Sequence, residues 1–164
     1  MHIFSQQQSL IVENPLKLTR FTDYAMRTLM HLAAHQDRLC SIAEVAQTYG
    51  ISQNHLMKVV NDLVRAGYIE GIRGRSGGIR LGKPASEINL GILVRHTEGG
   101  FELADCGNCV ISPRCRLTGI LKEALSAFLT VLDQYTLADL TVRPRDFEEI
   151  FGLPQITRRS GDCT

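Results

Sequence analysis

Three of the five cysteines of the chain, Cys106, Cys109 and Cys115, fall within ten residues, in the segment CGNCVISPRC. Thiolates are soft ligands, and a tight group of them suits an iron–sulfur cluster or a zinc ion. Three thiolates leave one coordination position for a further ligand. The spacing therefore predicts an inorganic site in this segment and makes a coincidental grouping of structural cysteines the weaker interpretation.

Zinc is the main alternative to a cluster. A Cys-x2-Cys pair is common in zinc sites, and a structural zinc takes four ligands, so that His96 is a candidate to complete a Cys3His set. Only one such pair is present, however. Of the remaining cysteines, we interpret Cys40 as a small buried hydrophobic residue and assign no role to Cys163.

The elements upstream of the cysteines form a helix-turn-helix pattern. Ser41 and Glu44 match a capping box at the start of one helix, and Gly50 supplies its end. Ser52 is the expected N-cap of the next helix. An earlier helix is expected to begin with Thr22 as its cap.

A β-hairpin is predicted directly after the second of these helices. Two short alternating stretches, 68–73 and 79–81, enclose a glycine-rich loop at 74–78. Placed there, the hairpin is the wing of a winged helix, and its glycines permit a close approach of the backbone to phosphate. Arg75 at the tip would reach a minor groove. A further short helix is expected at 88–96.

The start of the second helix and the wing together predict a DNA-binding surface. Asn and Gln can bond to adenine edges, and Lys can contact guanine or phosphate. Any solvated helix offers similar residues, but the preceding helix, the turn and the arginines of the wing favour DNA binding over a protein-interaction module. The predicted DNA-binding residues are Ser52, Gln53, Asn54, His55, Lys58, Arg73 and Arg75.

A long helix is predicted from Ser112-Pro113 onward, with Ser112 as N-cap and Pro113 at the first helical position. Cys115 would lie in its first turn, where the helix dipole favours the ligating thiolate. Apolar residues then recur at alternating spacings of four and three, as in a coiled coil. Packing against the chain's own helices is the alternative to dimerisation, which we favour because helix-turn-helix proteins read palindromic sites as symmetric dimers. The predicted dimerisation residues are Leu121, Leu125, Phe128, Leu132 and Tyr135.

The expected fold is mainly α with a small β-hairpin, a winged helix-turn-helix domain followed by a long C-terminal dimerisation helix. We divide the chain into a flexible N-terminal extension at 1–16, the DNA-binding domain at 17–97, a cysteine-rich cluster-binding loop at 98–116, the dimerisation helix at 113–140 and a C-terminal tail at 141–164.

Composition narrows the class of protein. The net charge is only +1, but Lys and Arg gather between residues 52 and 83, as in a DNA-binding protein with one DNA-facing surface. No apolar run approaches the roughly 20 residues that span a bilayer, and the N-terminus lacks a secretory signal. We therefore expect a cytoplasmic protein without a membrane partner, in which clustered cysteines bind metal or do redox chemistry. No catalytic constellation is present, so we do not expect an enzyme.

Several motifs, in order, resemble the family of iron–sulfur winged-helix repressors that includes the nitric-oxide sensor NsrR and its relatives IscR and RirA. The resemblance covers residues 17–153. Its motifs are KLTRFTDYAMR (17–27), YGISQNH (49–55), RAGY (65–68), RGRSGGIRLGKPA (73–85) and LDQYTLADL (132–140).

The resemblance implies a homodimeric repressor that binds a palindromic operator in double-stranded DNA and holds one iron–sulfur cluster per subunit, [4Fe–4S] with [2Fe–2S] as the alternative. Cys106, Cys109 and Cys115 would ligate the cluster, with Asp23 of the partner subunit as fourth ligand. An acid at that position would otherwise indicate only a favourable interaction with the helix dipole. Nitrosylation of the cluster by nitric oxide would relieve repression of nitric-oxide detoxification genes.

One feature departs from the family. Two residues separate Cys106 from Cys109, where four or five are expected, whereas the five-residue gap before Cys115 matches. Two alternative functions therefore remain open: an iron-responsive or redox-responsive iron–sulfur regulator of the same family, and a winged-helix module stapled by zinc.

Overall fold

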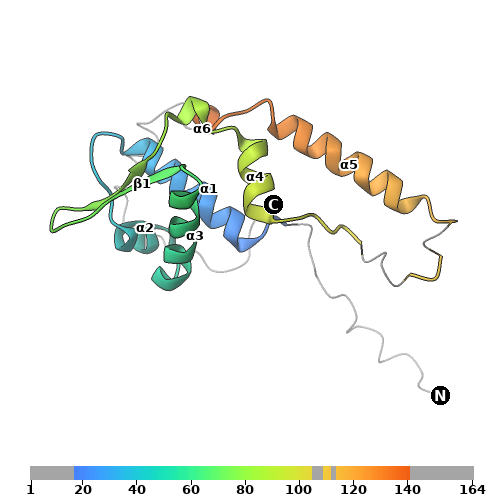
Figure 1. The fold of residues 1–164 in the computed structure, drawn as a ribbon, viewed down its shortest axis with the longest axis horizontal. Helices are drawn as coiled ribbons and strands as arrows, with labels where there is room; N and C mark the ends of the chain where they lie inside the picture. The colour runs from blue at the N-terminus through green and yellow to red at the C-terminus, as the bar shows by residue number, and fades with distance from the viewer. Residues whose placement is uncertain (1–16, 105–108, 112–113, 141–164) are drawn as a thin grey trace, which may run out of the picture.

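A computed structural model describes residues 17–104, 109–111 and 114–140 of the chain (Figure 1). Helices dominate the described residues, and one antiparallel pair of strands accompanies them, which confirms the predicted fold class. The elements are α1 (Arg20–Ala34), α2 (Ile42–Tyr49), α3 (Gln53–Arg65), β1 (Ile69–Ile72), β2 (Gly78–Leu81), the short 3-10 helix η1 (Ala85–Glu87), α4 (Leu90–Glu98), α5 (Leu117–Leu132) and α6 (Leu137–Leu140). The predicted extension 1–16 and tail 141–164 lie outside the described residues.

Helix α1 begins three residues earlier than its predicted cap implied. The N-cap is Thr19, whose hydroxyl accepts a hydrogen bond from the backbone N–H of Thr22 at 3.3 Å. The prediction that Thr22 is the cap was therefore wrong. Thr22 lies inside the helix, fully buried, and its hydroxyl donates to the hydroxyl of Thr97 at 2.8 Å.

Helices α2 and α3 form the predicted helix-turn-helix. The capping box is confirmed, because the N–H of Glu44 donates to the Ser41 hydroxyl while the Glu44 carboxylate accepts from the Ser41 N–H. Gly50 ends α2 in the left-handed region with a φ of 63°, a conformation that costs glycine little. Ser52 occupies the N-cap position of α3 as predicted, but its side chain makes no cap hydrogen bond.

The core lies between α1, α2, α3 and the base of the hairpin. The inward face of α3 is the predicted one, formed by Leu56, Val59, Val60 and Leu63, each at most 2% exposed. Burying a side chain of this size contributes about 1.5–3 kcal/mol relative to leaving it exposed. Cys40 is also fully buried, in agreement with its interpretation as a small core residue.

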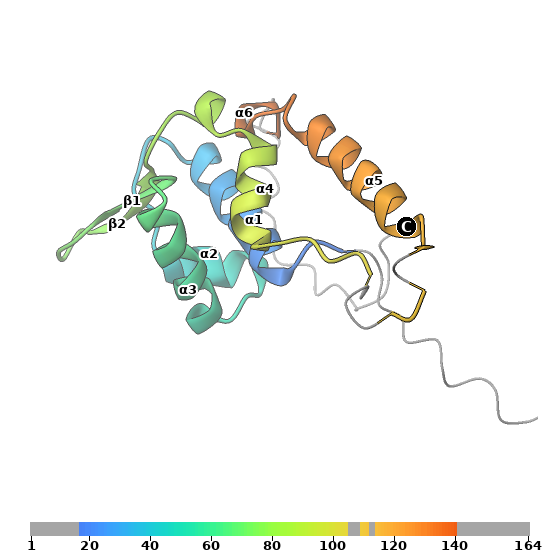
Figure 2. The same ribbon diagram turned by 45° about the vertical axis from the view of Figure 1, so that its right-hand side comes forward.

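The hairpin protrudes from this core (Figures 1 and 2). Its base is attached to the loop between α1 and α2, since the N–H groups of Cys40 and Ile79 each donate to the other's carbonyl, at 3.0 and 2.8 Å. A Cβ on Gly78 would lie 2.7 Å from the carbonyl oxygen of Cys40, so glycine is required at this close approach. The wing is therefore held by backbone hydrogen bonds as well as by its buried Ile69 and Ile79.

Helix α5 is shorter than the predicted helix at 113–140. It begins at Leu117 with Arg116 as N-cap and ends at Leu132, and α6 follows as a separate turn. The break has a local cause: the Asp139 carboxylate accepts hydrogen bonds from the N–H and hydroxyl of Thr136, which caps a new helical turn. The proposed start at Ser112-Pro113 lies outside the described residues.

Helix α4 lies between the core helices and α5, so that α5 projects to one side of the molecule (Figures 1 and 2). The C-terminal end of α5 is attached to α4. There Arg95 of α4 forms a two-pronged ion pair with Asp133, the C-cap residue of α5, at 2.5 and 2.7 Å. None of the described helices is long and apolar enough to cross a membrane.

Candidate nucleic-acid interface and metal centre

The predicted DNA-binding residues of α3 all face solvent. Because the buried face of α3 recurs at 56, 59, 60 and 63, the positions at 53, 54, 55 and 58 turn outward at its N-terminal end. Ser52, Gln53, Asn54, His55 and Lys58 are each exposed. The first two turns of α3 thus present amide, imidazole and ammonium groups to an external partner.

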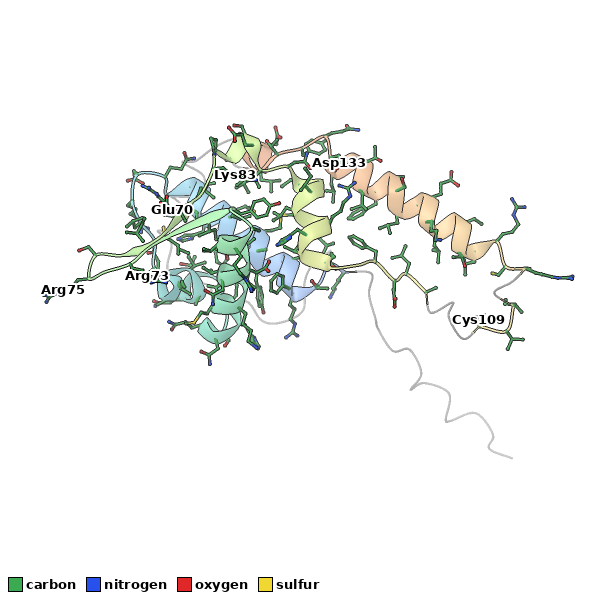
Figure 3. All side chains as sticks on the ribbon, viewed as in Figure 1. Glu70, Arg73, Arg75, Lys83, Cys109 and Asp133 are labelled. Carbon is green, nitrogen blue, oxygen red and sulfur yellow. The ribbon has the colours of Figure 1, made fainter. Side chains whose placement is uncertain are left out.

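The wing adds cationic groups to the same end of the molecule. Arg73 and Arg75 are exposed, and Arg75 lies at the hairpin tip (Figure 3). Arg80 is instead engaged within the hairpin by Glu70, at 2.9 Å, and the Lys83 ammonium lies 4.3 Å from the centroid of the Tyr68 ring. The structure therefore separates two outward arginines from two basic residues that serve the fold.

The tight turn of the wing depends on glycine. Gly74 has a φ of 121°, and a Cβ on Gly77 would lie only 2.2 Å from the carbonyl oxygen of Ile72. No other residue fits this turn without a backbone shift. The turn positions Arg75 beyond the rest of the hairpin, as a minor-groove contact requires.

Cys109 lies at the opposite end of the molecule from the wing tip (Figure 3). Cys109 is exposed and far from Arg75 (Figure 3), Cys115 is half-buried, and Cys106 lies outside the described residues. Cys115 precedes the first residue of α5 by two positions, so its predicted place in the first helical turn was wrong. It still lies beside the N-terminal end of α5, where the helix dipole favours negative charge.

The described part of the cysteine-rich loop fits a soft inorganic group. Val110 and Ile111, which follow Cys109, are 95% and 66% exposed. Thiolate donors among exposed apolar side chains suit an iron–sulfur cluster, which such side chains would shield from water. His96 is engaged elsewhere, because its Nε2 lies 2.7 Å from Asp62 Oδ2 and links α4 to α3.

Asp23 lies in the first turn of α1, where its Oδ1 accepts a hydrogen bond from Arg27 Nε at 2.8 Å. The side chain is 43% exposed. The N–H and hydroxyl of Thr19 both donate to the Glu98 carboxylate, so this turn is tied to the last turn of α4. Since the cysteine-rich loop leaves α4 at Gly99, Asp23 belongs to the junction from which that loop departs.

The four predicted dimerisation residues within α5 recur on one side of the helix but differ in exposure. Leu121, Leu125 and Leu132 are half-buried, whereas Phe128 and Tyr135 are 43% and 47% exposed, and Tyr135 follows the end of the helix. The helix contacts α4, and the half-buried residues recur on one side of it.

A neighbouring apolar stripe on α5, which shares Phe128 with the predicted set, was missed from sequence. It recurs at spacings of three and four and comprises Leu117, Ile120, Ala124, Phe128 and Val131, all exposed. The periodicity was visible in the sequence, but which of the two neighbouring stripes faces α4 depends on the packing of the whole chain.

Comparisons with known proteins agree with this geometry. Residues 18–143 match the Rrf2 family, described as an iron-dependent transcriptional regulator. The HTH-type transcriptional regulator NsrR of Bacillus subtilis is 47% identical over 146 residues, covering 85% of this chain and 100% of that protein. NsrR of Bacillus licheniformis is 51% identical over 131 residues, covering 76% and 92%.

Solved structures show the same fold. IscR of T. potens is 25% identical with a TM-score of 0.65, covering 85% of this chain and 93% of that one. CymR, the global cysteine regulator of B. subtilis, is 29% identical with a TM-score of 0.60, covering 78% and 98%. The relatives are named as transcriptional regulators, which confirms the predicted class of protein and opposes an enzymatic role.

Proposed function

The chain belongs to the Rrf2 family of transcriptional regulators, and from this premise we propose that it is a dimeric, DNA-binding repressor whose iron–sulfur cluster senses nitric oxide. The observation that carries the proposal is the separation of the two exposed sites. The outward face of α3 and the wing lie at one end, and Cys109 of the cysteine-rich loop lies at the other (Figure 3). The iron-dependent family description and the NsrR relatives support the cofactor and the signal.

In this proposal the α3 helices of two subunits enter successive major grooves of a palindromic operator. Asn54 and Gln53 bond to base edges, while Lys58 and Arg73 contact bases or phosphate. Arg75 enters the flanking minor groove. Both α3 helices must then keep a fixed spacing, about one turn of the DNA helix apart, for the dimer to bind tightly.

The cluster ligands in this proposal are Cys106, Cys109, Cys115 and the partner's Asp23. When bound, the cluster supplies an iron atom with a hard, weak oxygen ligand, at which nitric oxide reacts. The exposed Cys109 and half-buried Cys115 are accessible for such ligation. We propose a [4Fe–4S] cluster, with [2Fe–2S] as the alternative.

Asp23 gives the site a route to the DNA-binding surface. Its helix turn is tied to α4 through Thr19 and Glu98. A ligand bond from Asp23 to the cluster would join this junction of one subunit to the cysteine-rich loop of the other. Loss of that bond would release the two α3 helices from their fixed spacing. Coupling of about 2–3 kcal/mol between the two sites would change DNA affinity by roughly 30–150-fold.

The test combines metal analysis with DNA binding. We expect anaerobically purified protein to contain near-equal iron and acid-labile sulfide, and nitric oxide to weaken its binding to an operator fragment by at least roughly 30-fold. Cys115→Ser should lose the cluster and the nitric-oxide response together. Cys163→Ser, which changes a cysteine outside the triplet, is the matched control and should retain both.

The outcomes separate the alternatives. Zinc without sulfide would reject the gas-sensing mechanism and leave a zinc-stapled winged helix. A cluster-bound protein whose DNA affinity follows iron supply but not nitric oxide would instead identify an iron-responsive regulator, which the family description also supports.

A further inference from the structure

Three metal-ligating side chains meet in the core of the winged helix, far along the chain from the cysteine triplet. One ring nitrogen of His31, one of His35 and the Sγ of Cys40 lie within 4.8 Å of one another. His31 and Cys40 are buried, and His35 is half-buried. The histidines are four residues apart on α1 and so share one helix face, and the loop after α1 returns Cys40 to that face.

Hydrogen bonds orient both imidazole rings. His35 Nδ1 lies 2.8 Å from the carbonyl oxygen of His31, and because a carbonyl only accepts, Nδ1 carries the proton. His31 Nε2 lies 3.3 Å from Glu44 Oε1, and a carboxylate likewise only accepts. The lone pairs of the rings are therefore on His35 Nε2 and His31 Nδ1.

This arrangement is the one that supports metal-ligating histidines, in which the second ring nitrogen donates to a carboxylate or a backbone carbonyl. The Arg38 guanidinium, hydrogen-bonded to Glu44, lowers the pKa of that carboxyl to about 2 and keeps it ionised as an acceptor. Burial lowers the pKa of His31, which favours the neutral, ligating form of the ring.

The competing interpretation is a packed aromatic cluster. The His31 and His35 rings stack with centroids 4.5 Å apart, and Tyr49 meets His31 edge-on at 5.8 Å. Burial also raises the pKa of the Cys40 thiol to about 11, so a metal ion must displace its proton. Stacking explains the two rings, but it does not explain why a thiol completes a triangle of ligand atoms around them.

We propose that His31, His35 and Cys40 form a second metal site, separate from the cysteine triplet, for a divalent ion of the zinc class. Two imidazole nitrogens and one sulfur are ligands that zinc prefers, and water would take the fourth position. With Zn–N near 2.0–2.1 Å and Zn–S near 2.3 Å, tetrahedral ligand atoms lie about 3.4–3.6 Å apart. The three ligand atoms now lie within 4.8 Å of one another, so shifts of roughly 1 Å would bring them to these separations.

The site occupies the junction of three elements that carry the DNA-binding surface. Cys40 is hydrogen-bonded to Ile79 of the wing, and Glu44 belongs to the capping box that starts α2. The two histidines belong to α1. A bound ion would therefore tie α1, α2 and the wing together and stabilise the winged helix against unfolding.

The experiment must keep the cysteine triplet from binding the probe. In the full-length C106S/C109S/C115S variant, Co²⁺ replaces zinc as a spectroscopic probe. We expect one equivalent to bind with a thiolate-to-cobalt charge-transfer band and tetrahedral d–d bands, and zinc to displace it. In the cluster-loaded wild-type protein, one zinc should bind without loss of iron or sulfide.

His35→Gln, placed in the same triplet-free chain, is the decisive variant because His35 is only half-buried and its replacement leaves the core in place. The affinities for Co²⁺ and zinc should both fall by more than roughly 100-fold. Loss of a group that only hydrogen-bonds to a ligand costs roughly 10–100-fold, so a larger loss indicates a direct ligand. The zinc-dependent rise in Tm should disappear, while the metal-free Tm changes little. His55→Gln, an exposed histidine on α3, is the control and should bind both metals as before.

Two results would overturn the proposal. One is cobalt binding without the charge-transfer band, because Cys40 is the sole described ligand candidate of the triangle that supplies sulfur. The other is equal metal affinity in His35→Gln and the triplet-free parent. Circular dichroism of metal-free His35→Gln shows whether this variant is folded, so that a loss of metal binding is not mistaken for a failure to fold.

Discussion

The winged-helix unit (α1, α2, α3 and the β1–β2 hairpin) and the arm (the cysteine-rich loop at 98–116 and α5) place their apolar side chains differently. In the unit, each helix buries one face, and Leu29, Leu56 and Leu63 are fully buried. In the arm, α5 is more hydrophobic than α1, α2 or α3, yet none of its residues is buried, and Ile120 is 58% exposed. Apolar surface of this extent, exposed along one helix, marks an interaction site.

This difference separates a unit that buries its own apolar side chains from a helix that leaves them exposed. In the unit, backbone N–H and C=O groups find hydrogen-bond partners through the capping box of α2, the left-handed Gly50 and the bridge between Cys40 and Ile79. The arm is joined to the rest at α4, through the ion pair between Arg95 and Asp133, and at α6, whose Leu137 is fully buried in the core. We therefore expect stability to be decided in the unit and assembly to be decided in the arm.

The largest effect should come from the core of the unit. Leu63→Ala removes a fully buried side chain and should lower the free energy of unfolding by about 2–5 kcal/mol, through lost burial and a residual cavity. Leu117→Ala makes the same change on α5, where the side chain is 49% exposed, and should cost about 0.5 kcal/mol or less in dissociated protein. Urea denaturation at low protein concentration measures both, and equal costs would remove the distinction between the two regions.

The next effect concerns the exposed stripe of α5. Phe128→Asp should raise the dimer dissociation constant at least about 30-fold, as expected for a central apolar contact worth about 2 kcal/mol or more. Ser126→Asp adds the same charge on the opposite side of the helix and is the matched control. Sedimentation equilibrium distinguishes them. If both variants remain dimeric, α5 is not the dimerisation surface.

A smaller effect is expected at the wing tip. Arg75→Ala should weaken binding to specific and non-specific DNA alike and reduce the slope of log affinity against log salt by about 1, as for the loss of one phosphate contact. Arg80→Ala removes an arginine that pairs with Glu70 within the hairpin and should leave the slope unchanged. Fluorescence anisotropy over a salt series provides the measurement. A slope equal to wild type in Arg75→Ala would argue against the wing contact.

The smallest effect is expected at the joint between the two regions. The hydrogen bonds from Arg95 lower the pKa of Asp133, so this pair stabilises the joint above the unfolded-state pKa of that carboxyl, and the contribution is lost as the pH falls below it. Both side chains are exposed, so the contribution is small. Asp133→Asn should remove this pH dependence. The pH dependence of the joint is measured by hydrogen exchange of the Leu90 amide, which donates to the carbonyl of Tyr135. Identical exchange profiles at acid pH in the wild type and Asp133→Asn would show that this pair does not stabilise the joint.

Sequence reasoning succeeded where a feature depends on neighbouring residues. The capping box of Ser41 and Glu44, the end of α2 at Gly50 and the apolar face of α3 each follow from side chains within one or two turns. The hairpin was equally predictable, because its glycines have no substitute in so tight a turn.

It failed where the outcome depends on residues far along the chain. Thr19 and Thr22 are both competent caps, and the choice between them is fixed by Thr97 and Glu98, more than 70 residues away. The face of α5 that meets α4 is another such case. For the triangle in the core, the spacing of His31 and His35 was visible, but the return of Cys40 depends on its bridge to Ile79.

The exposure of the cysteine-rich loop also bears on how such a protein changes over generations. None of the described residues at 98–104, 109–111 and 114–116 is buried, so none supports the core that holds α3 and the wing. Insertions and deletions in this loop therefore cost the DNA-binding surface little. We therefore expect the length of this loop, including the two-residue gap between Cys106 and Cys109, to vary among related chains without loss of DNA binding.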